Sequence, residues 1–278
     1  MKTRFDSLDQ SSITALARQI AKSTCKLYVY QSDRPSVPQS HGSSVLFEFD
    51  NSGYCISNAH VLSDKYFGQV FALNGANKSM TIGGHFVSTS MPPSGKREDD
   101  IFDISIIKLT DLAVTWLKES GYIFLDIKKI KSGVILSKTD SLLIVGYPAS
   151  KTKTNVQKRS LNTSPFYLVT TTSVNAFRHS NFSDEYHIAV NYRRNKIIKP
   201  QSKGFESGPQ PYGMSGGGVW LLEKNNQGTF DVYLISIMFE YLKEKSAIVS
   251  TRIDLFLDII KQKLDPNIPT NGIGISIL

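Results

Sequence analysis

A serine among glycines is the strongest chemical signal in this sequence. Residues 213–218 read Gly-Met-Ser-Gly-Gly-Gly, which places Ser215 in a turn. A serine hydroxyl is a weak nucleophile until a base removes its proton, and the oxyanion formed by its attack on a carbonyl needs hydrogen-bond donors. Flanking glycines let the backbone bring N–H groups close to a substrate. We therefore predict Ser215 as a nucleophile, with the N–H groups of Gly213 and Ser215 as its oxyanion hole. The alternative is an ordinary glycine-rich turn between strands.

His60 is the predicted base. Residues 56–61 read Ile-Ser-Asn-Ala-His-Val, so His60 lies where an apolar strand changes to a loop or short helix. A histidine in such a position can take the serine proton, although a purely structural histidine is the alternative. The other four histidines lack such a setting, and none forms a pair with metal-ligand spacing. We predict no metal site and no cofactor.

Asp103 is the predicted orienting carboxylate. It begins residues 103–109, which read Asp-Ile-Ser-Ile-Ile-Lys-Leu and are typical of a buried strand. A carboxylate beside such a strand needs a partner, and it could hold the imidazole of His60 in the correct tautomer. The acidic residues at positions 98–100, in a neighbouring polar loop, remain rivals.

The order of these residues along the chain excludes two other catalytic arrangements. Residues 213–217 also match the G-x-S-x-G pattern of α/β-hydrolases, in which the histidine follows the serine. The last histidine here is His187, so that arrangement fails. Subtilisin has aspartate first, whereas the order histidine, aspartate, serine is that of chymotrypsin.

With these motifs, the chain resembles the trypsin-like (chymotrypsin-fold) serine peptidases. Residues 57–60 are similar to the family's T-A-A-H motif, residues 103–107 to D-x-A-x-L, and residues 213–217 to G-D-S-G-G. Residues 144–148 resemble the segment that often follows the first barrel in bacterial, intracellular members. The resemblance covers residues 27–264. It implies two six-stranded antiparallel β-barrels with the site between them, and a C-terminal helix.

The resemblance also implies a substrate-binding segment, and it has informative departures. By position, Ser236, Ile237 and Met238 would pair with substrate and wall the specificity pocket. Met214 stands where secreted relatives have an aspartate that captures the amine freed by zymogen cleavage, so that activation switch should be absent. No aspartate lies six residues before Ser215, so cleavage after Arg or Lys is not supported, and the specificity stays open.

The remaining pattern predicts an all-β protein with a helix at each end. The domains expected are an N-terminal helical extension (1–23), a first β-barrel (24–148), a second β-barrel with the C-terminal helix (149–264) and a tail (265–278). Polar segments at 91–100 and 151–165 read as loops. Apolar stripes predict helices over 13–21 and 253–264. Strands are expected at 25–30, 41–49, 54–57, 69–73, 85–89, 101–109, 142–145, 166–174, 186–192, 218–223, 230–238 and 247–250.

The composition bears on the binding partners and the cellular location of the protein. The chain has 278 residues with 32 Lys and Arg against 24 Asp and Glu, and the basic residues are spread along it. We interpret the charge as a solvated basic surface, because no nucleic-acid-binding motif accompanies it. No apolar stretch reaches membrane-spanning length, and the N-terminus lacks a signal-peptide core. We predict a cytoplasmic protein without a membrane partner. Cys25 and Cys55 are expected to be reduced and buried, with a disulfide between them as the alternative.

These observations predict a serine endopeptidase that cleaves a protein or peptide substrate through an acyl-enzyme. An unrestrained peptidase in the cytoplasm would be toxic, so we expect narrow specificity or gating by a regulatory protein partner. The alternative is a catalytically idle binding module on the same fold.

Overall fold

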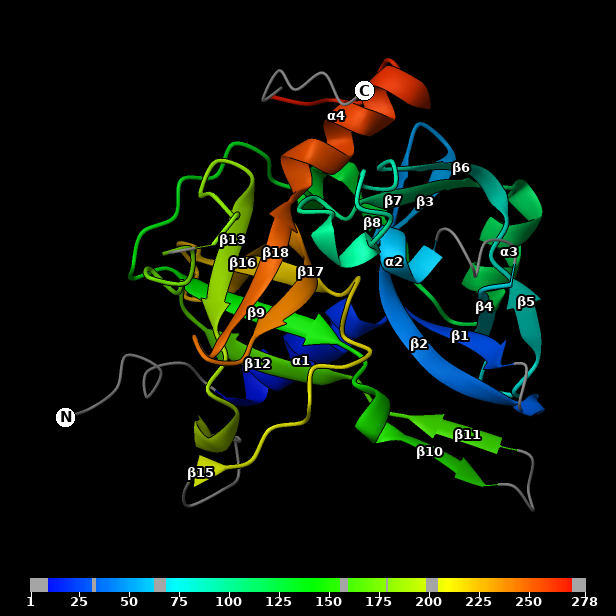
Figure 1. The fold of residues 1–278 in the computed structure, drawn as a ribbon, viewed down its shortest axis with the longest axis horizontal. Helices are drawn as coiled ribbons and strands as arrows, with labels where there is room; N and C mark the ends of the chain where they lie inside the picture. Colours follow the sequence, from blue (N-terminus) through cyan, green and yellow to red (C-terminus); the bar gives the residue numbers. More distant parts are fainter. Residues whose placement is uncertain are drawn as a thin grey trace.

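Two curled antiparallel sheets, one from each half of the chain, lie side by side (Figure 1). A computed structural model describes residues 10–31, 34–62, 69–155, 160–178, 180–198 and 205–271. The sheets form two half-barrels, so the expected chymotrypsin-like fold is confirmed.

The first sheet has the order β5-β4-β1-β2-β3-β7-β6, with β8 pairing in parallel with β2. Six of the seven strands expected in the first barrel (24–148) are in this sheet. Two further strands, β5 and β8, have only three and two residues, which is too short for a recognisable alternation of apolar and polar side chains. The bounds are β1 Thr24–Gln31, β2 Arg34–Phe49, β3 Ser52–Ser57, β4 Phe71–Leu73, β5 Ser79–Thr81, β6 Gly84–Ser88, β7 Ser105–Leu109 and β8 Leu125–Asp126.

The second sheet has the order β12-β9-β16-β17-β18-β13. Five of these are the strands expected in the second barrel, whereas β9 is the strand at 142–145 that was expected in the first barrel (24–148), so the expected boundary at 148 falls after the first strand of the second sheet. Part of the expected loop at 151–165 is instead the hairpin β10 and β11, whose polar sequence gave no strand signal. A further two-stranded ribbon pairs β14 with β15. The bounds are β9 Ser141–Gly146, β10 Thr152–Asn155, β11 Ser160–Thr163, β12 Phe166–Thr170, β13 His187–Asn191, β14 Ile197–Ile198, β15 Phe205–Glu206, β16 Gly218–Lys224, β17 Phe230–Leu242 and β18 Ala247–Arg252.

The central strands bury both of their faces, which explains their continuous apolar sequences. In β9, Leu142 and Ile144 point into the core of the second sheet. Leu143 and Val145, on the opposite face, belong to a larger core that also contains residues of the first sheet and of the terminal helices. The two half-barrels are therefore joined by a shared apolar core.

Both expected terminal helices are present, and one internal helix is new. The helix α1 (Gln10–Ala21) contacts β9, and α4 (Ile253–Lys263) contacts β17 and β18. The unexpected α3 (Asp111–Glu119) is capped by Thr110, whose Oγ1 accepts a hydrogen bond of 3.3 Å from the N–H of Ala113. It buries only two side chains, too few for a clear stripe. None of the helices in the described part of the chain has the length and apolar character needed to cross a bilayer.

The two cysteines are buried thiols in the core of the first sheet, with no disulfide between them. Burial raises the pKa of the Cys55 thiol to about 12 and raises the pKa of Cys25 further. Of the expected terminal segments, residues 1–9 and 272–278 lie outside the described part of the chain.

Candidate active site

His60 and Asp103 meet through the pairing of two strands of the first sheet. His60 lies on the one-turn helix α2 (Ala59–Leu62), directly after β3, and Asp103 lies two residues before β7. His60 Nδ1 is 2.5 Å from Asp103 Oδ2, and the His60 backbone N–H donates to Oδ1 at 2.9 Å. Because a carboxylate only accepts, Nδ1 carries the proton, which leaves Nε2 as the basic nitrogen.

The backbone of Asp103 is held as firmly as its carboxylate. Its φ of 48° is in the left-handed region, which is uncommon for a residue other than glycine. The Asp103 carbonyl accepts from the Ala59 N–H at 3.2 Å and from Asn58 Nδ2 at 3.1 Å. The residues just before His60 therefore fix the aspartate that orients it, a role of Asn58 that the sequence analysis did not predict.

Asp100, one of the rivals of Asp103, has a supporting role. Its Oδ1 accepts from the N–H of Asp103 at 3.0 Å, while Oδ2 accepts from Thr89 Oγ1 at 2.5 Å and Arg97 Nη1 at 2.8 Å. The other rivals, in the 3₁₀ turn Arg97–Asp99, have exposed side chains. Only Asp103 among these carboxylates contacts His60 in the described structure.

Ser215 lies in the turn that leads into β16 and is partly exposed. Its Oγ donates to the carbonyl of Phe239 at 3.3 Å, so in the described residues it makes no hydrogen bond to His60. Phe239 is followed by Glu240, which is close enough to Asp103 to feel its charge. Neighbouring residues of β17 therefore interact with Ser215 and with Asp103.

Two N–H groups of the turn are left without a partner. The Tyr212 carbonyl accepts from the Ala149 N–H at 2.8 Å, and the Met214 carbonyl accepts from the Gly217 N–H at 2.8 Å. In a trans peptide the C=O and the following N–H point in opposite directions, so both bonds aim the N–H groups of Gly213 and Ser215 the other way. Those two N–H groups donate to no residue that the structure describes.

Two hydrogen bonds from Ser43, in the first sheet, hold the same turn in place. Its N–H donates to the Ser215 carbonyl at 2.7 Å, and its Oγ donates to the Gly213 carbonyl at 2.9 Å. Gly216 has φ of 85°, and a Cβ there would lie 1.8 Å from the Ser43 carbonyl oxygen. A glycine is therefore required at 216 for the turn to meet the first sheet.

A cavity of about 250 Å³ opens beside Ser215. Its lining comes from residues 210–212, 214 and 215, from residues 238–241 and from Ile248. Of the predicted substrate-binding residues, Met238 lines this cavity, whereas Ser236 and Ile237 are fully buried and do not. An irregularity in the β17–β18 pairing between Met238 and Glu240 separates the exposed end of the strand from its buried part. Position-by-position transfer could not anticipate that break.

Glu240 is the only charged residue among the described lining of this cavity. Its partial burial, together with the charge of Asp103, raises the pKa of its carboxyl group. The rest of the lining is mainly apolar or aromatic, which favours an uncharged guest.

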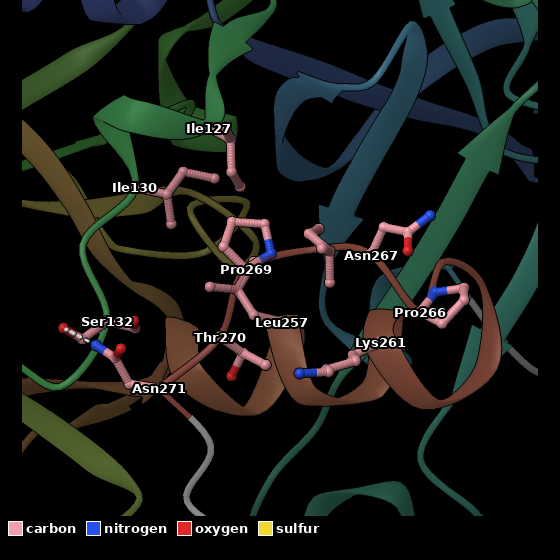
Figure 2. Close-up of a pocket in the computed structure, with 11 residues that line it drawn as sticks. Ile127, Ile130, Ser132, Leu257, Lys261, Pro266, Asn267, Pro269, Thr270 and Asn271 are labelled. Atoms are coloured by element: carbon pink, nitrogen blue, oxygen red, sulfur yellow. Dashed lines mark hydrogen bonds between the residues drawn. The ribbon is translucent and has the colours of Figure 1, made fainter.

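A second cavity, of about 320 Å³, lies between α4 and the chain that follows it (Figure 2). Figure 2 shows Pro269 lying between the helix and the side chains of Ile127 and Ile130. Its described lining contains no His, Cys, Asp or Glu, and its one titratable side chain is that of Lys261. Nor does any part of the described chain gather three such residues as a metal site would require.

Comparisons with known proteins support the fold. No protein-family profile matches the chain, and no curated protein matches its sequence. Among solved structures, the chain is similar to the inactivated protease paralogue S-I1 of the scabies mite, with a TM-score of 0.50 and 14% identity over 88% of this chain and 96% of that one. At that identity the likeness shows the fold alone.

Proposed function

We propose that this protein is a serine endopeptidase with His60, Asp103 and Ser215 as its catalytic triad. The observation that carries the proposal is the pair of N–H groups on Gly213 and Ser215, which donate to no described residue and are aimed to the same side of the turn. Two donors so placed beside a serine could both bind one oxyanion. Such donors are what an oxyanion requires.

The proposed reaction begins when Ser215 Oγ leaves the Phe239 carbonyl and attacks the scissile carbonyl of the substrate. His60 Nε2 takes the hydroxyl proton, and Asp103 stabilises the resulting imidazolium. The N–H groups of Gly213 and Ser215 bind the oxyanion. His60 then protonates the leaving amine, and a water molecule, activated by the same nitrogen, hydrolyses the acyl-enzyme.

The cavity beside Ser215 is the proposed site for the substrate side chain that precedes the scissile bond. The buried Met214 and Met238 contribute to its lining. We expect an uncharged side chain of medium size to fit best. Since Met214 packs in the apolar core of the second sheet, we also propose that no freed N-terminal amine activates the enzyme.

The setting that we propose is the cytoplasm, as in bacterial intracellular relatives, with narrow specificity or gating by a protein partner. A catalytically idle binding module is the second candidate. One observation favours it: the Ser215 hydroxyl donates to the Phe239 carbonyl rather than to His60. Apo enzymes often have loose catalytic hydrogen bonds that tighten only with substrate, so this contact does not exclude catalysis.

A fluorophosphonate probe separates these two candidates. We expect it to label the wild-type protein covalently, and the Ser215→Ala variant to remain unlabelled. A matched control, Ser94→Ala, removes an exposed hydroxyl and should label like the wild type. A wild-type protein that stays unlabelled both alone and with candidate protein activators would support the idle module. Identification of new peptide termini, with wild type and Ser215→Ala side by side, would then define the cleaved sequences.

A further inference from the structure

Lys26 is a buried lysine without a carboxylate partner among the described residues. Its side chain, on β1, is 3% exposed, and its Nζ donates to the Tyr147 carbonyl at 2.7 Å. Burying an ammonium group without an opposite charge costs several kcal/mol. An apolar side chain would fill the same space more cheaply, so the presence of a lysine needs an explanation.

The Lys26 ammonium lies directly behind the proposed oxyanion hole. A Cβ on Gly213 would be 3.3 Å from Lys26 Nζ and 2.9 Å from both the Tyr147 carbonyl oxygen and the Ala149 nitrogen. The lysine, the segment connecting the two sheets and the nucleophile turn therefore meet at Gly213, whose φ is 87°.

A short chain of contacts links the lysine to one oxyanion donor. Lys26 holds the carbonyl of Tyr147, and two residues later the Ala149 N–H holds the Tyr212 carbonyl. That second bond sets the plane of the peptide whose N–H belongs to Gly213. If residues 147–149 moved, this peptide could rotate and turn its N–H away from the substrate.

We propose that Lys26 is a positioning residue for the oxyanion hole, which it supports through Tyr147 and Ala149 and to which it adds a buried positive charge. This inference rests on the proposed serine peptidase function. The charge matters because an oxyanion develops in a water-poor site, where a fixed cation nearby stabilises it more than it would in water.

The ionisation of Lys26 makes the proposal measurable. Burial lowers its pKa to about 7. The titratable groups near it are Cys25 on the same strand, His41 on β2 and the phenol of Tyr147, the residue whose backbone carbonyl accepts from Lys26. Burial raises the pKa of Cys25 and Tyr147 and lowers that of His41 to about 4, so these three groups are neutral at neutral pH. Of the four, Lys26 is the one that changes charge there.

The test uses the rate of fluorophosphonate labelling of the full chain, measured against probe concentration and pH. Three proteins are compared: wild type, Lys26→Met, and the control Lys108→Met, which removes a half-buried lysine 3.6 Å from Asp265. For Lys26→Met we expect a limiting rate roughly 10- to 100-fold lower, below the effect of deleting a whole oxyanion donor, with the saturation constant unchanged. Its urea midpoint should be equal to or above that of wild type, because a buried charge is removed. His60 acts as the base in both proteins, so the two profiles are compared as a ratio: the wild-type limiting rate divided by that of Lys26→Met should fall as the pH rises through about 7.

A Lys26→Met protein that reacts like wild type would overturn the proposal. So would a slower reaction that comes with a lower urea midpoint and an unchanged pH profile, because that combination describes a purely structural lysine. If the variant does not fold, the wild-type profile decides, since a limiting rate that stays level from about pH 7 to about pH 9 contradicts the inference. Failure of the proposed function looks different, because the wild-type protein would then not be labelled at Ser215 at all.

Discussion

The two halves of the candidate site treat their polar groups in opposite ways. In the Asp103 segment, both carboxylate oxygens, the backbone N–H and the carbonyl all have partners. In the Gly213 to Ser215 turn, the carbonyls have partners, but two N–H groups donate to no described residue. We call the Asp103 segment the saturated half, because every hydrogen-bonding group of Asp103 has a partner.

This difference corresponds to what each half would do during a reaction. The orienting carboxylate acts before and throughout catalysis, so complete hydrogen bonding keeps it in one geometry. The oxyanion donors act when charge develops on the substrate, so they must be aimed at that position and not be bound to another group of the protein. The saturated half should therefore tolerate little change, whereas the other half should depend on the contacts that keep its free donors aimed.

Asp103→Asn should produce the largest loss of reactivity, because it replaces the carboxylate that orients His60. An amide can present its NH₂ to His60 Nδ1, which favours the wrong tautomer and leaves Nε2 protonated. We expect labelling by the fluorophosphonate to slow by about 10⁴-fold. Asp99→Asn, which alters an exposed carboxylate in the same region, should react like wild type. Equal rates for the two variants would remove Asp103 from the triad.

Gly216→Ala should come next, because it separates the nucleophile turn from the first sheet. The added Cβ meets the Ser43 carbonyl oxygen, a backbone atom that cannot move alone. We expect a loss of about 3 kcal/mol or more in unfolding free energy, measured in urea.

The control for that experiment is Gly228→Ala. Gly228 has a similar φ of 79°, but a Cβ there meets nothing within 4 Å. It isolates the cost of the left-handed backbone, roughly 1–2 kcal/mol. Similar losses for the two variants would show that the Ser43 contact does not restrict position 216.

The two-sheet fold could be predicted from the sequence because alternating or continuous apolar runs marked each main strand. Elements without such a local pattern were not predicted. The hairpin β10–β11 is polar, and α3 buries only Ala113 and Leu117. The residues of the proposed triad stood out because their types and order are unusual. In contrast, Ser236, Ile237 and Met238 were expected to line the specificity pocket, whereas the cavity beside Ser215 is lined by Met238, Phe239 and Glu240. The irregularity in strand pairing at this point is a tertiary feature that the sequence does not reveal.

The residues that support the site could not be predicted from the sequence either. Lys26, Ser43 and Asn58 look like ordinary strand or loop residues, and their roles depend on partners more than 40 positions away. Asp100 was visible only as a rival of Asp103. Its contacts with Thr89 and Arg97 show that it supports the same turn. Long-range hydrogen bonds of this kind leave no periodic signal in the chain.

The smallest predicted effect concerns His187, which ties the second sheet to the saturated half. It is 1% exposed, and its Nε2 lies 2.8 Å from the carbonyl of Ile101, two residues before Asp103. Since that carbonyl only accepts, Nε2 carries the proton, and Nδ1 lies 3.2 Å from the Ser183 nitrogen and 3.1 Å from the Ser183 carbonyl oxygen. In the neutral ring Nδ1 accepts from the Ser183 N–H, whereas a second proton on Nδ1 would replace that bond by one donated to the Ser183 carbonyl and would bury a positive charge.

Burial lowers the pKa of His187 below its ordinary value of 6.5. As the pH falls below about 6.5, the unfolded chain therefore takes up a proton before the folded protein does, and stability is lost. His41, with a pKa lowered to about 4, contributes in the same direction. We expect the unfolding free energy to drop by about 1–3 kcal/mol between pH 6.5 and pH 4.5, and His187→Gln to remove part of that slope while His85→Gln, on the exposed face of β6, leaves it intact. A slope that survives unchanged in His187→Gln would mean that the saturated half does not depend on a neutral histidine from the second sheet.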